Sequence, residues 1–196
     1  MTRGAGSRQS RASCCAPGVR AALLTLCLLL SPAVSAADAE ELLPALKVAY
    51  LYNFTRFVQW PKKPSETPFV ICVIGEPAME THLRALEREK KEVGGRPIAI
   101  RGLDRPDAPG ACQILFVGAA AGGSLDAIVR GTAGKPILLV GDTPGYVGRG
   151  VAIELYRKPD IFGKSERLRF RIDPAALKDR RLTVSAQLYD VAEVVR

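Results

Sequence analysis

The stretch Lys47–Pro61, KVAYLYNFTRFVQWP, decides how the rest of the chain can be arranged, because aromatic residues are otherwise scarce in this sequence. Its apolar side chains recur at helical spacing, so the pattern predicts a helix over Glu40–Trp60. The apolar stripe is wider than a surface helix needs, and Pro61 should end the helix. This helix either lies in the core or shares its excess apolar face with another chain. The residues concerned are Tyr50, Phe54, Phe57 and Trp60.

The first 36 residues have the pattern of an export signal. Met1–Arg20 carries four arginines and no acidic residue, Ala21–Leu30 is apolar, and small residues precede Ala37. The apolar run is well short of the ~20 residues that span a bilayer. We therefore expect a signal peptide over residues 1–36, cleaved after Ala36, and one domain over residues 37–196 in a bacterial periplasm.

Export also changes the charge of the chain. Without the four leader arginines, 24 basic and 20 acidic residues remain, a net charge of +4 instead of +8. A nucleic-acid-binding protein needs a strongly basic patch and access to nucleic acid, and we expect neither.

The order of apolar runs predicts a single α/β domain, in which helices flank a mixed sheet with a parallel core and antiparallel C-terminal strands. The expected parallel strands are Phe69–Ile74, Arg96–Gly102, Cys112–Gly118 and Pro136–Gly141, with helices over Pro77–Glu92 and Gly123–Gly131 between them. The expected later elements are strands at Val151–Arg157, Leu168–Ile172 and Leu182–Val184, a short helix after Asp173, and a closing helix over Ser185–Val195.

Catalytic patterns are missing from the sequence. His82 is the sole histidine and lies in a charged helical segment, which excludes a serine–histidine–aspartate triad and a zinc ligand set. No cofactor motif is complete. The glycine-rich loop GDTPGYVGRG, Gly141–Gly150, does follow a strand, where α/β proteins often bind ligands. It is either a plain turn or a small ligand or contact loop formed by Asp142, Tyr146 and Arg149.

Two further features leave alternatives open. Cys72 and Cys112 remain after loss of the leader, and in an oxidising compartment they either form a disulfide or stay reduced and buried. The arginines of Leu168–Ile172 and its flank could bind an acidic partner, or could keep a strand face solvated.

Several stretches together resemble the YfiR/HmsC-like family, in matching order over Leu43 to Val195. These stretches are KVAYLYNFTRFVQWP, FVICVIGEP, GRPI, CQILFVG, ILLVGDTPGY, RLRFRID and LTVSAQLYDVAEVV. The resemblance implies a structural disulfide between Cys72 and Cys112. A second family cysteine pair, in the segment around Gly141–Tyr156, is absent here, so redox sensing that depends on that pair is not expected.

The resemblance implies a periplasmic, non-enzymatic repressor that binds the periplasmic sensor region of an inner-membrane diguanylate cyclase. Such a repressor lowers cyclic di-GMP and biofilm formation, and an OmpA-like outer-membrane lipoprotein can sequester it. It also implies a homodimer, without cofactor or nucleic acid. The alternative function is a periplasmic module that senses a small ligand. We expect the closing segment to dock the partner through Leu182, Leu188, Tyr189 and Val191, because it has more apolar residues than one helix face buries.

Overall fold

The computed structural model describes residues 36–61, 67–106, 109–163 and 165–195, with side-chain surroundings from Leu42 onward. The chain divides into two units, Met1–Ala36 and Ala37–Arg196, and only the second is described below. Apart from Ala36, the expected signal peptide lies outside the described residues. None of the helices in the described ranges has both the length and the apolar character that crossing a membrane requires.

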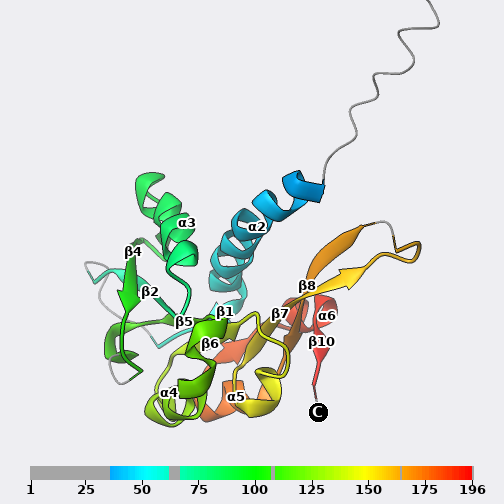
Figure 1. The fold of residues 1–196 in the computed structure, drawn as a ribbon. Helices are drawn as coiled ribbons and strands as arrows, with labels where there is room; N and C mark the ends of the chain where they lie inside the picture. Colours follow the sequence, from blue (N-terminus) through cyan, green and yellow to red (C-terminus); the bar gives the residue numbers. More distant parts are fainter. Residues whose placement is uncertain (1–35, 62–66, 107–108, 164, 196) are drawn as a thin grey trace, which may run out of the picture. The chain divides into compact units, whose positions relative to one another are not determined.

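Eight strands of the described chain form one mixed sheet in the order β10-β8-β7-β6-β5-β2-β4-β3 (Figure 1). Their bounds are Phe69–Ile74 (β2), Glu92–Val93 (β3), Arg96–Leu103 (β4), Ile114–Val117 (β5), Leu138–Gly141 (β6), Ile153–Pro159 (β7), Glu166–Ile172 (β8) and Glu193–Val194 (β10). Strands β4, β2, β5, β6 and β7 run parallel, whereas β7 and β8 form an antiparallel hairpin. The predicted α/β class, with a parallel core and antiparallel C-terminal strands, is confirmed.

Helices cover both faces of the parallel strands. Buried side chains of α2 (Ala36–Phe57), α3 (Pro77–Arg88), α5 (Pro174–Asp179) and α6 (Ala186–Val191) pack on one face. The other face is covered by α4 (Leu125–Thr132) and a 3-10 turn, η3 (Ala119–Ser124). Successive residues of β2 therefore enter different cores: Ile71 lies in the first and Cys72 in the second, and both are fully buried. A strand buried on both faces has no polar alternation, which explains its continuous apolar run.

The opening helix ends earlier than expected, at Phe57 instead of Trp60. Val58 and Gln59 form a short strand, β1 (Val58–Gln59), antiparallel to β9 (Thr183–Val184), and Ser185 N–H donates to the Phe57 carbonyl at 2.9 Å. Pairing with a segment more than a hundred residues away replaces the last helical turn. Local sequence does not encode that competition.

The closing segment is also not one helix, as the expected span Ser185–Val195 required. Helix α6 ends at Val191, and β10 then adds to the sheet parallel to β8, with Val195 N–H donating to the Ile172 carbonyl at 2.9 Å. The expected short helix after Asp173 is present: the Asp173 carboxylate accepts hydrogen bonds from the N–H groups of Ala175 and Ala176 and so caps α5. The helix expected over Pro77–Glu92 ends at Arg88, and Glu92 instead begins β3, an unexpected short strand that pairs with β4. The other expected elements differ only near their ends.

Candidate functional site

The sheet topology creates one crevice where ligands commonly bind in α/β proteins. Strand β4 lies on one side of β2, and the next strand in sequence, β5, lies on the other, so the chain reverses direction across the sheet between β2 and β5. Such a reversal opens a crevice at the carboxyl ends of the strands. A glycine lies at each of these strand ends: Gly75 follows β2, Gly118 follows β5, and Gly141 is the last residue of β6.

Protein atoms fill this crevice closely. A Cβ on Gly75 would lie 2.5 Å from the Ala121 nitrogen, and a Cβ on Gly141 would lie 2.6 Å from the Tyr146 ring. Tyr146 is itself buried, and its hydroxyl donates to the Gly118 carbonyl at 3.4 Å. The glycines are thus required by close packing within the chain, which gives them a role that needs no bound ligand.

Three charged side chains converge at the same strand ends. Lys47 of α2 donates hydrogen bonds to Asp142, which follows β6, and to Glu76, which follows β2, the latter at 3.4 Å. The side chain of Lys47 is 12% exposed, that of Asp142 16% and that of Glu76 28%. The Lys47 ammonium also lies 6.0 Å from the centre of the Phe116 ring. We call Lys47, Glu76 and Asp142 the strand-end cluster; it carries one positive and two negative charges.

The two carboxylates of the strand-end cluster are not equally compensated by Lys47. Burial lowers the pKa of Lys47, but the hydrogen bonds and charges of Asp142 and Glu76 outweigh burial and raise that pKa above 10.5. Burial raises the pKa of Glu76, the charge of Asp142 raises it further, and Lys47 opposes both. The two directions are compatible because Lys47 binds Asp142 more closely, leaving Glu76 the less well compensated carboxylate.

The structure places the three loop residues in different roles. Asp142 belongs to the strand-end cluster, Tyr146 fills the crevice, and the exposed Arg149 pairs with Asp126 at 2.8 Å. Asp142 and Tyr146 are thus brought together near the strand ends, whereas Arg149 points to α4. Ligand binding by this loop stays a prediction, and the filled crevice favours a structural role.

Lys47 and Glu76 were missed from the sequence, although a signal for each exists. Lys47 interrupts an apolar helix and has no acidic residue three or four positions away, so its partner had to be distant. Glu76 follows a strand and a glycine, as Asp142 does. The described ranges contain no group of three or more His, Cys, Asp or Glu placed to hold a metal ion. The hydrogen bonds of Lys47 to Asp142 and Glu76 attach α2 to the strand ends.

The aromatic residues of the opening helix face the core. Phe54 is 1% exposed, and Tyr50 and Phe57 pack partly buried against the same core. Phe54 and Phe170 meet edge to face with ring centres 5.2 Å apart, as do Trp60 and Phe69 at 5.1 Å. Of the two interpretations of these residues, the placement fits a core helix; a role in dimer contact stays a prediction.

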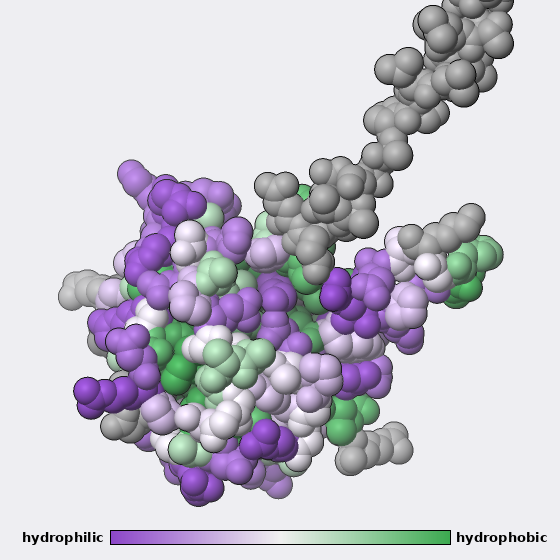
Figure 2. Space-filling view, in the orientation of Figure 1, coloured by the Kyte–Doolittle hydropathy of each residue, from purple (hydrophilic) through white to green (hydrophobic). Residues whose placement is uncertain are grey.

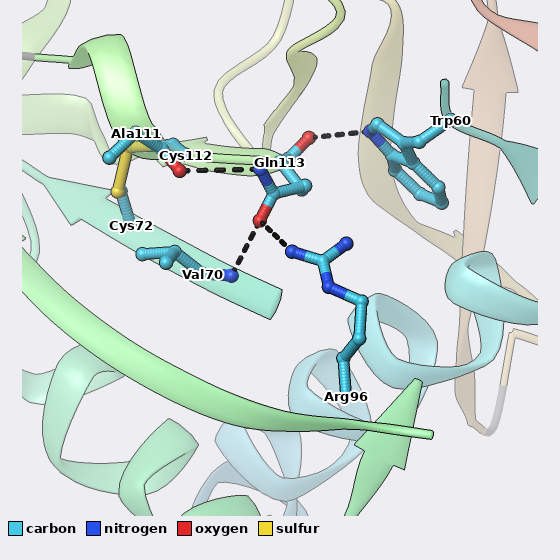
Figure 3. Close-up of a disulfide and its surroundings, with 7 residues drawn as sticks. All are labelled: Trp60, Val70, Cys72, Arg96, Ala111, Cys112 and Gln113. Atoms are coloured by element: carbon cyan, nitrogen blue, oxygen red, sulfur yellow. Dashed lines mark hydrogen bonds between the residues drawn. A yellow bond between two sulfur atoms is a disulfide. The ribbon is translucent and has the colours of Figure 1, made fainter. Parts of the chain in front are cut away.

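Cys72 and Cys112 form a disulfide, as the resemblance implied, with their Cα atoms 5.8 Å apart. Figure 3 shows that the disulfide lies beside a buried polar side chain, Gln113. Gln113 was not among the residues predicted from the sequence. Its Oε1 accepts hydrogen bonds from Val70 N–H at 2.7 Å and from Arg96 at 3.4 Å. The Gln113 carbonyl accepts from the Trp60 indole at 3.0 Å. Gln113 thus links β2, β4 and the segment that follows β1.

The residues expected to dock a partner divide into two layers. Leu182 is 6% and Leu188 is 3% exposed, so both belong to the core, and Tyr189 packs partly buried against it. Val191 is 57% exposed. Beside them is an open hollow of about 370 Å³, lined in part by Tyr189, Leu182 and Lys178. Partner contact through this segment stays a prediction, in which Val191 and Tyr189 are accessible and the two leucines support them.

A second polar network holds the end of the chain. Arg171 pairs with the fully buried Glu154 at 2.9 Å and with Glu193 of β10 at 3.1 Å. The Tyr156 hydroxyl donates to Glu193 at 2.6 Å, and the Arg171 guanidinium lies 4.1 Å from the centre of the Tyr156 ring. The hydrogen bond from Tyr156, followed by that from Arg171, lowers the pKa of Glu193. These contacts explain why the C-terminal segment joins the sheet.

The fold is an α/β domain in which the glycines at three strand ends, Gly75, Gly118 and Gly141, pack closely against protein atoms. The family described as YfiR/HmsC-like matches residues 44–193, and the chain belongs to this family. The family is generally one of non-enzymatic regulators, and membership supports a regulator of the cyclic di-GMP pathway in general. No curated protein sequence matches the chain.

A crystal structure described as a conserved domain protein from Vibrio cholerae O1 biovar El Tor has a similar fold, with a TM-score of 0.51 and 11% sequence identity. The match covers 78% of this chain and 60% of the Vibrio chain, less than two thirds of that protein's length. At this identity the likeness concerns the fold alone.

Proposed function

We propose that this protein is a periplasmic regulator that represses an inner-membrane diguanylate cyclase by contact with the cyclase's periplasmic sensor region. The observation that carries the proposal is the family match over residues 44–193, nearly all of the described chain. Repression would lower cyclic di-GMP and biofilm formation, and sequestration by an OmpA-like outer-membrane lipoprotein would relieve it. The protein itself would perform no catalysis.

The contents of the strand-end crevice support contact as the mode of action. Tyr146 and Lys47 occupy the position where an α/β enzyme or sensor would hold its ligand. The chain instead leaves apolar side chains exposed elsewhere, including Val191 at 57%. Such an exposed apolar side chain, together with the hollow at Tyr189, favours a protein partner.

The contact surface that we propose includes the hollow that Tyr189 and Leu182 help to line, and the exposed Val191 at the end of α6. Leu182, which lines the hollow, is a buried core residue, and so is Leu188 on the neighbouring helix α6. Lys178 and Arg181 stand at its rim and would favour an acidic partner surface.

The experiment compares Val191→Asp with Thr81→Asp, a matched control at an exposed position of α3. Tagged protein is used to capture its partner from detergent-solubilised inner membrane, and cellular cyclic di-GMP is measured in parallel. We expect Val191→Asp to lose the cyclase and to raise cyclic di-GMP, while Thr81→Asp retains both properties. Unchanged thermal unfolding would show that the variants are folded. If Val191→Asp captured the cyclase and repressed it normally, the proposed surface would be wrong.

We also propose a homodimer, held by a different part of α2 from the aromatic stretch. Leu42 and Leu46 are 60% and 48% exposed and lie one turn apart, whereas Tyr50 and Phe54 turn toward the core. Sedimentation equilibrium should give twice the chain mass for the native protein and a single chain mass for Leu42→Glu/Leu46→Glu. A native protein that sediments as a single chain would contradict the dimer.

A further inference from the structure

The outer half of the β7–β8 hairpin extends beyond the rest of the sheet (Figure 1), and its turn carries two exposed apolar side chains. Ile161 is 91% and Phe162 is 76% exposed, more than any other large apolar residue of the described chain. Figure 2 shows hydrophobic surface at this end and hydrophilic surface along the arms behind it. Single exposed apolar residues are ordinary, but an adjacent pair at the end of a projecting hairpin indicates a contact.

Hydrogen bonds link the described residues of the turn, Asp160–Gly163 and Ser165. The Asp160 carboxylate accepts hydrogen bonds from Phe162 N–H at 3.1 Å and from the Ser165 hydroxyl at 2.8 Å. The backbone closes the turn with Asp160 N–H donating to the Ser165 carbonyl at 2.8 Å, and Gly163 provides the positive φ of 64°. Asx turns of this kind hold a loop in one shape. The two apolar side chains are thus held at the tip and are not folded back.

The arms behind the tip carry an excess of positive charge. The three acidic residues of the hairpin are already engaged. Glu154 pairs with Arg171 at 2.9 Å, Asp160 closes the turn, and Glu166 pairs with Arg157 at 3.3 Å. Lys158, Arg167 and Arg169 are exposed, and they form no ion pair within the described part of the chain. Together with Pro159, Asp160 and Ile161 they line an open hollow of about 380 Å³, in which three cations face one carboxylate.

Two of these cations oppose each other directly. Lys158 and Arg167 are cross-strand partners in the β7–β8 register, and Arg169 follows on the same face. Like charges at paired positions destabilise a hairpin, so the arrangement has a cost in the free protein. A bound anion between the arms would offset that cost.

We propose that the β7–β8 hairpin docks on an anionic phospholipid bilayer. Ile161 and Phe162 enter the boundary between headgroups and acyl chains, while Lys158, Arg167 and Arg169 contact lipid phosphates. Two side chains are far too small for a stable protein interface, which buries over ~1,000 Å². They suffice for interfacial anchoring when basic residues add attraction to anionic lipids.

The dimensions of the hairpin fit this arrangement. Lys158 lies three residues before Ile161, which is at most about 10 Å along the chain, so its ammonium can lie at headgroup level when Ile161 enters below it. Long basic side chains can lie along the headgroups while their stems cover apolar surface. The inference goes beyond the proposed function, although such docking would hold a regulator at the membrane surface where its partner resides.

The test measures co-sedimentation of the purified protein with vesicles of phosphatidylethanolamine and phosphatidylglycerol, and with vesicles of phosphatidylcholine alone. We expect binding to the anionic vesicles that weakens as salt is added. Ile161→Ser/Phe162→Ser should weaken the partition coefficient about tenfold or more. Lys158→Glu/Arg167→Glu should abolish the preference for anionic lipid.

Matched controls separate the hairpin from general stickiness. Val194→Ser removes an exposed apolar side chain elsewhere, and Arg88→Glu/Arg130→Glu makes the same change of charge on two helices. Both should bind vesicles as the native protein does. No vesicle binding at low salt, or equal loss in hairpin and control variants, would overturn the proposal. The proposal would also be wrong if the native protein bound no vesicles and the hairpin variants lost binding to an acidic protein instead.

Discussion

Lys47 in α2 and Asp142 after β6 form an ion pair between side chains that stand 95 positions apart in the sequence. The pair joins the opening helix to the carboxyl ends of the central strands, and Glu76 extends it to β2. Because α2 also carries the core residues Leu51 and Phe54, the strand-end cluster and the core hold the same helix. The ion pair should therefore contribute to stability in a measurable way.

Removing the lysine should destabilise the fold. Lys47→Met keeps the apolar stem but leaves Asp142 and Glu76 as largely buried neighbouring carboxylates, and breaking a pair of this kind costs about 2–3 kcal/mol. Urea unfolding measures the loss as a lower midpoint with an unchanged slope. Arg149→Met is the control, because the Arg149–Asp126 pair is exposed and should contribute below ~0.5 kcal/mol. Equal effects of the two substitutions would contradict a structural role for the cluster.

The pH dependence of stability should reveal Glu76. Burial, then the charge of Asp142, raises the pKa of Glu76 above its ordinary 4.5. The folded protein binds this proton more tightly than the unfolded chain, so the contribution of Glu76 is complete below about pH 4.5 and is lost as pH rises through the folded-state pKa. Glu76→Gln should thus be more stable than the native chain at pH 7, and the difference should vanish near pH 4.

Urea unfolding of both proteins at several pH values between those limits checks this sign. If attraction to Lys47 dominated at Glu76, Glu76→Gln would instead be less stable than the native chain at pH 7. That deficit would shrink as the pH fell. Gln187→Glu, at an exposed position of α6, provides a carboxylate with no such environment and should show no comparable trend.

The parallel core could be read from the sequence because its strands are buried on both faces. A run such as Phe69–Ile74 is apolar throughout, ends at a glycine, and admits few interpretations other than a central strand. The start of α5 could also be predicted from the sequence, because Asp173 and Pro174 act on their immediate neighbours. In each case the determining interactions are local or depend only on burial.

The strand-end cluster and the chain end could not be read because their determinants are distant. The end of α2 depends on pairing of Val58 with Val184, and the strand after α6 depends on Arg171 and Tyr156 holding Glu193. Periodicity alone continues both helices. Lys47 is similar: its sequence neighbours show only that no local partner exists.

Loss of the disulfide should weaken the fold strongly. The bond joins Cys72 to Cys112, 40 positions apart, and in the chain-entropy model such a link restricts the unfolded state by about 4 kcal/mol. Cys72→Ala/Cys112→Ala should lower the free energy of unfolding by about this amount. Native protein unfolded with and without reductant should show the same difference. An unchanged urea midpoint on reduction would contradict a stabilising role.

Gln113 should matter more than its single neutral side chain suggests. It is 3% exposed, its Oε1 accepts from Val70 N–H at 2.7 Å, and its Nε2 donates to the Ala111 carbonyl at 3.3 Å (Figure 3). Gln113→Leu preserves volume but leaves the buried Val70 N–H without its acceptor, which costs about 2 kcal/mol. Urea unfolding measures the loss, and hydrogen exchange should show reduced protection of the Val70 amide. Gln187→Leu, at an exposed site, should change neither quantity. A Gln113→Leu protein with native stability and native Val70 protection would show that another group, or water, satisfies this amide.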